Sequence, residues 1–134
     1  MSHWQSLTKR RGTDILWTVY IKTRDKGLCT VNFRCFKGSE GSDVSHYHGR
    51  RKETVRYDDE NCDFVCRACH NFVHTALGAK IYDEWKLKQL GQKRFNLLLL
   101  RANLTGKRDD VIAKIIIKQK IKDLDELQRN PNYN

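Results

Sequence analysis

Apolar residues recur at intervals of three or four along four stretches of the chain, a spacing typical of helices that bury one face. The helices that this pattern predicts span residues 14–25, 81–90, 95–102 and 109–128. Gly91 separates the second helix from the third, because glycine is a weak helix former that often follows a helix end. In the third helix, Phe95, Leu98 and Leu99 are expected to face inward. The last helix carries a long apolar stripe, which either closes the core or pairs with a second copy of the chain.

Between the first two helices the pattern changes. Residues 28–42 are rich in turn formers and predict a loop, whereas 43–47 and 55–57 are short and partly β-like and predict a small hairpin. Beyond these strands the pattern is helical again and places His70 and His74 one turn apart on one face. The expected fold class is therefore α+β.

The composition fits one small compact domain with a basic surface. The 134 residues are 39% hydrophobic and 31% charged, so the core is small and would gain from a metal staple. Lysine and arginine number 26 against 16 acidic residues, and the formal charge of +10 favours nucleic acid or an anionic membrane surface as a partner. The longest apolar run is four leucines, whereas a membrane span needs about 20 apolar residues. Because no secretion signal is visible either, we expect a cytoplasmic protein whose five cysteines are reduced thiols.

Four of the five cysteines form two pairs that suit a structural zinc site. Cys66 and Cys69 form a Cys-x-x-Cys pair, whose tight turn points both sulfur atoms at one ion. Cys29 and Cys35 are the natural second pair, although the five residues between them exceed the usual two to four. In the alternative, Cys29 or Cys35 is a small buried residue, and Cys62 or a histidine supplies the fourth ligand. In the four-cysteine arrangement, Cys62 is left over as a half-buried strand residue.

Three histidines remain for chemistry. His70 and His74 are four residues apart, a spacing that lets both imidazoles reach one cation. His46 lies on the first predicted strand, where alternation puts Asp43 and Ser45 on one face and His46 on the other. A neutral imidazole beside a metal-bound phosphate can take a proton from water at physiological pH, although a lone histidine on a strand is usually structural.

Three segments resemble the motif of HNH, or ββα-metal, endonucleases: SHYHGRR (45–51), RYDDEN (56–61) and CRACHNFVH (66–74). Within this superfamily the chain is most similar to phage recombination nucleases of the NinG (Rap) type, over roughly residues 14–105. The resemblance implies a small ββα-metal core stapled by a four-cysteine zinc site, between a flexible N-terminus (1–13) and a C-terminal helix (106–134). It also implies phosphodiester hydrolysis with Mg²⁺ or Mn²⁺ on branched DNA, such as Holliday junctions or D-loops, in the cytoplasm of a phage-infected bacterium.

Carried over position by position, the resemblance assigns roles to the candidate site residues. His46 would be the general base that activates water, and Asn61 would hold the loop and orient that histidine. His70 would bind the catalytic divalent ion, and His74 would bind it or contact the phosphate. The structural zinc would be bound by Cys29, Cys35, Cys66 and Cys69. The phosphates beside the scissile one would be gripped by the planar guanidinium groups of Arg50, Arg51 and Arg56, in a loop that is otherwise simply basic and exposed.

Two departures from the family pattern leave alternatives open. Ser45 stands where many HNH enzymes have an aspartate or histidine ligand, so Asp43 is nominated as the first metal ligand, with Ser45 itself and His48 as alternatives. If His48 substitutes, it is also open which histidine is the base. The wide spacing of the first cysteine pair leaves the zinc ligation open. The rival function is a non-catalytic, zinc-stabilised module that binds DNA or a recombination partner, and a weaker third is an RNA-binding regulator. For a junction nuclease, the two symmetric cuts favour a homodimer.

Overall fold

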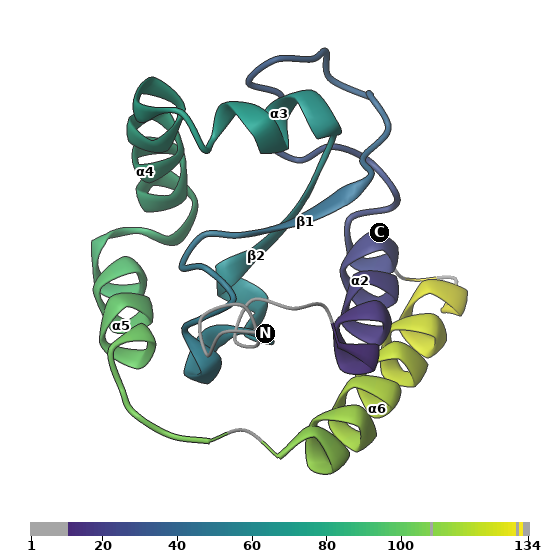
Figure 1. Cartoon of the computed structure of the whole chain (residues 1–134). Helices are drawn as coiled ribbons and strands as arrows, with labels where there is room; N and C mark the ends of the chain where they lie inside the picture. The colour runs from purple at the N-terminus through teal and green to yellow at the C-terminus, as the bar shows by residue number, and fades with distance from the viewer. Residues whose placement is uncertain (1–10, 108, 131, 133–134) are drawn as a thin grey trace.

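The computed structural model describes residues 11–107, 109–130 and 132, which form the predicted α+β fold. These residues form five α-helices, a two-stranded antiparallel sheet and two short 3-10 helices. In chain order the elements are α2 (Gly12–Arg24), β1 (Asp43–His46), η1 (Glu53–Val55), η2 (Asp59–Asn61), β2 (Cys62–Val65), α3 (Arg67–Phe72), α4 (Ala76–Leu90), α5 (Gln92–Ala102) and α6 (Asp110–Arg129). Helices α2 and α6 lie on one side of the hairpin and α4 and α5 on the other, with α3 across its end (Figure 1).

The helix boundaries follow capping signals in the sequence. Gly91 ends α4 with a φ of 78°, a backbone conformation that glycine adopts without strain, so the predicted break is confirmed. Helix α4 begins at Ala76, earlier than predicted, because the Thr75 hydroxyl accepts a hydrogen bond from the Gly78 N–H at 3.0 Å. The Asp109 carboxylate caps α6 in the same way. Of the predicted flexible N-terminus, residues 1–10 lie outside the described part of the chain, whereas α2 already begins at Gly12.

The second strand of the hairpin is not the segment that the pattern predicted. The prediction of a strand at residues 55–57 is wrong, because Val55 is the last residue of the 3-10 helix η1 and packs against Leu98 and Ala102. The strand that pairs with β1 is β2, in which all four residues are buried. A strand that is buried on both faces shows no alternation of apolar and polar residues, so its sequence gave no strand signal.

The C-terminal helix closes the core rather than forming a separate unit. Ile117 of α6 packs with Trp17 and Ile21 of α2 against one face of the hairpin. The buried face of α6 is centred on Ala113 and Ile117 instead of the predicted stripe. The exposed apolar residues of α6 are Val111, Ile112, Ile115, Ile116 and Leu127. They leave room for the homodimer expected from the sequence, which stays a prediction.

The prediction for α5 is confirmed only in part. In α5, Leu98 is fully buried as predicted, but Leu99 is 44% exposed and Phe95 only partly buried, so the inward face of this helix is narrower than expected. None of the described helices combines the length and the apolar character that crossing a membrane requires.

Arg56 forms a buried ion pair that ties α2 to the segment before β2. Its side chain has no exposed surface, and its Nε and Nη2 donate to the Asp14 carboxylate at 2.9 and 2.6 Å. The prediction that Arg56 binds a DNA phosphate is therefore wrong, because a buried guanidinium that is bound to a carboxylate cannot reach DNA.

Replacing Asp14 with asparagine is expected to lower the free energy of unfolding at pH 7 by about 3–5 kcal/mol, because the buried Arg56 charge would lose the carboxylate that binds it at 2.6 Å and keep the more distant Glu53, at 3.7 Å. Burial opposes the ionisation of Asp14, but hydrogen bonds from Arg56, Arg11 and Tyr57 outweigh it and lower the pKa of Asp14 from 3.8 to about 2. The stabilisation is therefore complete above about pH 4 and is lost as the pH falls toward 2.

Urea unfolding at pH 7 and pH 3 measures both effects. The difference in the free energy of unfolding between variant and wild type should be smaller at pH 3. The control Asp123→Asn, on the exposed face of α6, should change the free energy by less than about 0.5 kcal/mol; equal losses would contradict the prediction.

Candidate functional site

Four cysteines converge on one point between the loop before β1 and the start of α3. The Sγ atoms of Cys29, Cys35, Cys66 and Cys69 all lie within 4.8 Å of one another. Two of them, in Cys35 and Cys69, are 3.7 Å apart. Tetrahedral zinc with Zn–S bonds of about 2.3 Å separates its sulfur ligands by roughly 3.8 Å, whereas a disulfide needs about 2.05 Å. The cluster is therefore compatible with a structural zinc, as predicted.

The local backbone explains how this site tolerates the wide spacing of the first pair. Asn32, between the two cysteines, has a φ of 53° and turns the chain back, while its side-chain amide donates to the Cys35 Sγ at 3.2 Å. Backbone N–H groups of Arg34 and Cys69 donate to the sulfur atoms of Cys69 and Cys66 at 3.3 and 3.4 Å. Although burial opposes it, hydrogen bonds from Asn32 and other neighbours lower the pKa of Cys35 to about 7. Such donors favour the thiolate form that binds zinc at Cys35, whereas burial raises the pKa of Cys29 and of Cys69.

The fifth cysteine stands apart from the cluster. Cys62 on β2 packs with Trp17 and Phe64, and it accepts a hydrogen bond from the Trp17 indole at 3.2 Å. It is a strand residue as predicted, but fully rather than half buried. Burial raises the pKa of its thiol, so Cys62 is an inert core residue.

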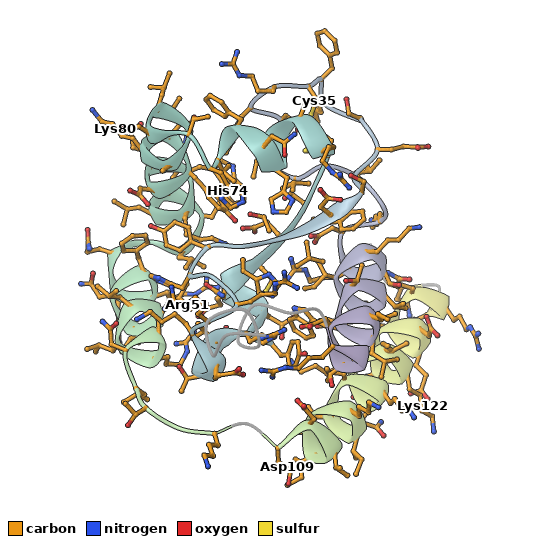
Figure 2. The ribbon with its side chains drawn as sticks, viewed as in Figure 1. Cys35, Arg51, His74, Lys80, Asp109 and Lys122 are labelled. Atoms are coloured by element: carbon orange, nitrogen blue, oxygen red, sulfur yellow. The ribbon has the colours of Figure 1, made fainter. Side chains whose placement is uncertain are left out.

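The histidines meet in a groove of about 570 Å³ between α2, β1 and α3. Its lining includes Asp43, His46, Arg50, Arg67, His70 and His74. Strict alternation had put Asp43 and His46 on opposite faces, but both line this groove, because Asp43 is the first residue of its strand and its carboxylate turns toward α3. Figure 2 shows Cys35 in the loop above α3 and His74 below this helix, on the side of the hairpin.

His46 is held in one tautomer. Its Nε2 lies 3.0 Å from the carbonyl oxygen of Arg56, and since a carbonyl only accepts, Nε2 must carry the proton. The other nitrogen, Nδ1, is then the one with a lone pair. Burial, together with the positive charge of Arg50, lowers the pKa of His46 to about 4, so the ring is neutral at pH 7. A neutral imidazole with a fixed acceptor nitrogen can take a proton from water.

Asn61 is buried, and its hydrogen bonds hold the loop between the two strands. Its side-chain amide donates to the carbonyl oxygens of His48 and Val55 at 2.8 and 3.0 Å, and its Oδ1 accepts from the His48 N–H at 2.8 Å. The backbone of Asn61 also accepts from the Tyr47 N–H. These bonds fix the residues that directly follow His46, which agrees with the loop-holding role expected for Asn61.

Asp43, His70 and His74 offer the donor set for a divalent ion. The Nδ1 of His70 lies 2.9 Å from the Asp43 carboxylate, and the rings of His70 and His74 are 5.2 Å apart. Helix α3 ends at Phe72, so His74 lies just beyond the helix rather than on it. A carboxylate and imidazoles suit Mn²⁺, and Mg²⁺ through the carboxylate. In the described part of the chain, only the cysteine cluster brings three or more ligand atoms all within 4.8 Å, so these three donors are adjacent without being fully converged.

The two alternative ligands, Ser45 and His48, do not line the groove. Ser45 is buried and pairs in register with Asp63, whose carboxylate binds Tyr82 and Lys86 of α4. Ser45 therefore faces α4, away from the histidines. The sequence position before His46 cannot supply a metal ligand in this arrangement. Two carboxylates line the groove, and because Asp14 is bound to Arg56, Asp43 is the better candidate.

The arginines near the groove differ in their surroundings. Arg50 lines the groove, and Arg51 is exposed in the loop between the strands. Arg67, the first residue of α3, also lines the groove and was not singled out from the sequence. Its place between the two zinc cysteines was the only available signal, because its contact with Asp43 joins segments 24 residues apart.

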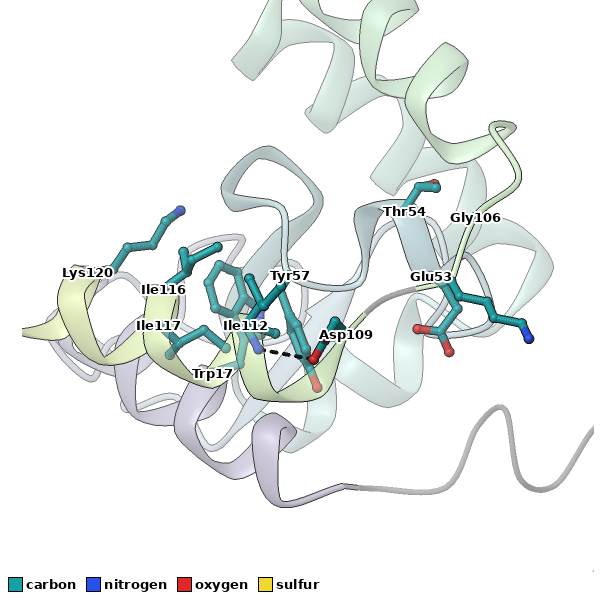
Figure 3. A pocket seen from close by; sticks show the side chains of 12 residues that line it. Trp17, Glu53, Thr54, Tyr57, Gly106, Asp109, Ile112, Ile116, Ile117 and Lys120 are labelled. Carbon is teal, nitrogen blue, oxygen red and sulfur yellow. Dashed lines mark hydrogen bonds between the residues drawn. The ribbon is translucent and has the colours of Figure 1, made fainter.

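A second hollow, of about 430 Å³, lies between α6 and η1 (Figure 3). Trp17, Tyr57, Ile112, Ile116 and Ile117 form much of its lining, and no histidine or cysteine of the described part of the chain is among the lining residues.

Comparison of the chain with protein-family models, with curated proteins and with solved structures found no match.

Proposed function

We propose that this protein is a metal-dependent DNA endonuclease of the HNH class, in which His46 deprotonates the water that attacks a phosphodiester. The observation that carries the proposal is the His46 tautomer. Its Nε2 proton is bound by the Arg56 carbonyl at 3.0 Å, which leaves Nδ1 as the proton acceptor in a groove that also holds Asp43 and His70. General bases of this kind accelerate hydrolysis by about 10²–10⁴-fold.

The other groove residues have complementary roles in this proposal. Asp43, His70 and His74 would hold Mg²⁺ or Mn²⁺, which supplies positive charge to the scissile phosphate and to the departing oxygen. Asn61 keeps the loop after His46 in place. Arg50, which lines the groove, and the exposed Arg51 would bind neighbouring phosphates, in keeping with the formal charge of +10.

The substrate class comes from the resemblance to phage recombination nucleases. This resemblance favours branched DNA intermediates, such as Holliday junctions and D-loops, as substrates. The enzyme would act on them in the cytoplasm of a phage-infected bacterium. If junctions are cut symmetrically, a homodimer would follow, and the exposed apolar residues of α6 could supply its interface.

A cleavage assay tests the proposal directly. Zinc-loaded protein is incubated with labelled four-way junction, D-loop and plain duplex DNA, each in Mg²⁺, in Mn²⁺ and in neither. We expect cleavage only with the divalent ion, and faster cleavage of the branched substrates than of the duplex. Binding of all three substrates without cleavage in either metal would contradict the nuclease. Equal cleavage of the three would contradict only the preference for branches.

A non-catalytic, zinc-stabilised DNA-binding module is the second candidate. It is favoured by Asp43, whose two carboxylate oxygens are already bound by Arg67 and His70, and by the incomplete convergence of the three metal donors. Metal stoichiometry separates the candidates. The module needs one zinc, whereas the nuclease needs a second, exchangeable divalent ion.

A further inference from the structure

Arg67 holds the carboxylate that the proposed metal site needs. Its Nε lies 2.7 Å from the Asp43 Oδ2, and its Nη2 donates to Oδ1 at 3.1 Å. The Arg67 side chain is 72% exposed, whereas that of Asp43 is 15% exposed. The guanidinium thus lies like a cover over a largely buried carboxylate at the rim of the histidine groove.

This contact competes with metal binding. His70 also contacts Oδ2 of Asp43, so both carboxylate oxygens have partners before any ion arrives. Each carboxylate oxygen has two lone pairs and can bind an ion beside a hydrogen-bond donor, but an ion at Asp43 would lie close to the positive charge of Arg67, which repels it unless the guanidinium withdraws. Arg67 is the partner that can withdraw most easily, because an exposed ion pair contributes little free energy and the arginine chain is long and flexible.

The displaced guanidinium then stands at the groove rim beside a cation. Two positive groups at short range repel each other, so the released, exposed Arg67 is either hydrated or paired with an anion. A backbone phosphate fits, because the planar fork of arginine binds two phosphate oxygens at once. Arg50 lines the same groove, so a DNA strand in it would have two arginines within its lining.

We propose that Arg67 covers Asp43 until the divalent ion binds, and that its released guanidinium then binds a phosphate of the DNA strand in the groove. This inference rests on the proposed nuclease function and names a residue that couples its two ligands. DNA occupies the arginine that the ion displaces, so each ligand strengthens the binding of the other.

Arg67→Gln and Arg94→Gln are the variants to compare. Arg94 is also exposed, at 58%, and its Nε also binds a carboxylate at 2.6 Å, that of Glu60, so the control removes the same charge and the same kind of contact on α5. First, Mn²⁺ binding to zinc-loaded protein is measured without DNA, from the electron paramagnetic resonance signal of free Mn²⁺. We expect Arg67→Gln to bind Mn²⁺ about two- to five-fold more tightly than wild type, and Arg94→Gln to match wild type.

Second, DNA affinity is measured with Mg²⁺ as a function of salt, with every protein carrying His46→Ala so that the DNA stays intact. Arg67→Gln should reduce the slope of log affinity against log salt by about 1, the effect of one lost phosphate contact, and Arg94→Gln should reduce it by less.

The outcomes separate this inference from the function on which it rests. Unchanged Mn²⁺ affinity in Arg67→Gln would contradict the claim that Arg67 shields Asp43 from the ion. An unchanged salt slope would contradict the claim that Arg67 binds a phosphate. The nuclease proposal stands in both cases. If wild type binds no Mn²⁺ beyond its zinc, or if Asp43→Asn binds Mn²⁺ as wild type does, the metal site itself is wrong and the inference falls with it.

Discussion

Replacing Cys69 with serine is expected to remove tightly bound zinc and to unfold the domain at 25 °C. Structural zinc contributes about 10–16 kcal/mol of apparent binding free energy in small zinc domains, which is as large as the whole stability of a typical domain. The cluster is also part of a core, because Cys69 is buried with Val31, Val65 and Tyr82. Losing the ion would leave the remaining cysteines beside that core without the bonds that join the two pairs.

Zinc content by mass spectrometry and thermal unfolding by circular dichroism measure this effect. Wild type should hold one zinc per chain, and a strong chelator should lower its unfolding temperature. Cys62→Ala is the matched control, because this cysteine is equally buried but lies outside the cluster. It should keep one zinc and lose only about 1–3 kcal/mol, the usual cost of a small core truncation. A Cys69→Ser protein that keeps its zinc and unfolds at the wild-type temperature would show that the cluster is not the structural site.

Replacing His46 with alanine is expected to reduce the single-turnover cleavage rate by about 10²–10⁴-fold. The fold should survive, because the His46 ring makes one hydrogen bond, to the Arg56 carbonyl, and lies at the groove rather than in the core. DNA affinity should change by less than about two-fold, since a neutral side chain contributes no charge to phosphate binding. The loss is therefore confined to the chemical step.

His48→Ala is the control for this experiment. The side chain of His48 does not line the groove, and only its backbone is bound by Asn61, so the variant should cleave at close to the wild-type rate. Rates are measured with enzyme in excess over labelled DNA, and binding is measured separately for each variant. If His46→Ala keeps more than a tenth of the wild-type rate, or if His48→Ala loses as much, His46 is not the base.

Several features of the fold follow from short-range chemistry and were predictable. Helix α4 stops at Gly91 because glycine takes up a positive φ there, and the short β-like segment that contains His46 forms strand β1. The zinc cysteines were predictable too, since Cys66 and Cys69 are close in sequence and a closed site needs a second pair. In each case the signal is contained within a few residues.

Other features depend on contacts between distant segments. The burial of Arg56 depends on Asp14, 42 residues earlier, so an arginine in a basic loop gave no sign of being enclosed. The strand β2 was missed because both its faces are covered, by α2 on one side and by α4 on the other. The contact of Arg67 with Asp43 likewise requires α3 to be folded back on β1.

By itself, the sequence determined which side chains are candidates for chemistry: four cysteines for one ion, three histidines, an asparagine and a carboxylate. Their residue types and local spacing set ligand preference and proton affinity, which are properties of single groups and short turns. Only the tertiary structure decided which of them meet. It brought Asp43 and His46 into one groove, turned Ser45 toward α4, enclosed Arg56 and placed Arg67 over Asp43. The reason is that burial and ion pairing depend on distance in space, which the chain sets only when its hairpin and helices pack together.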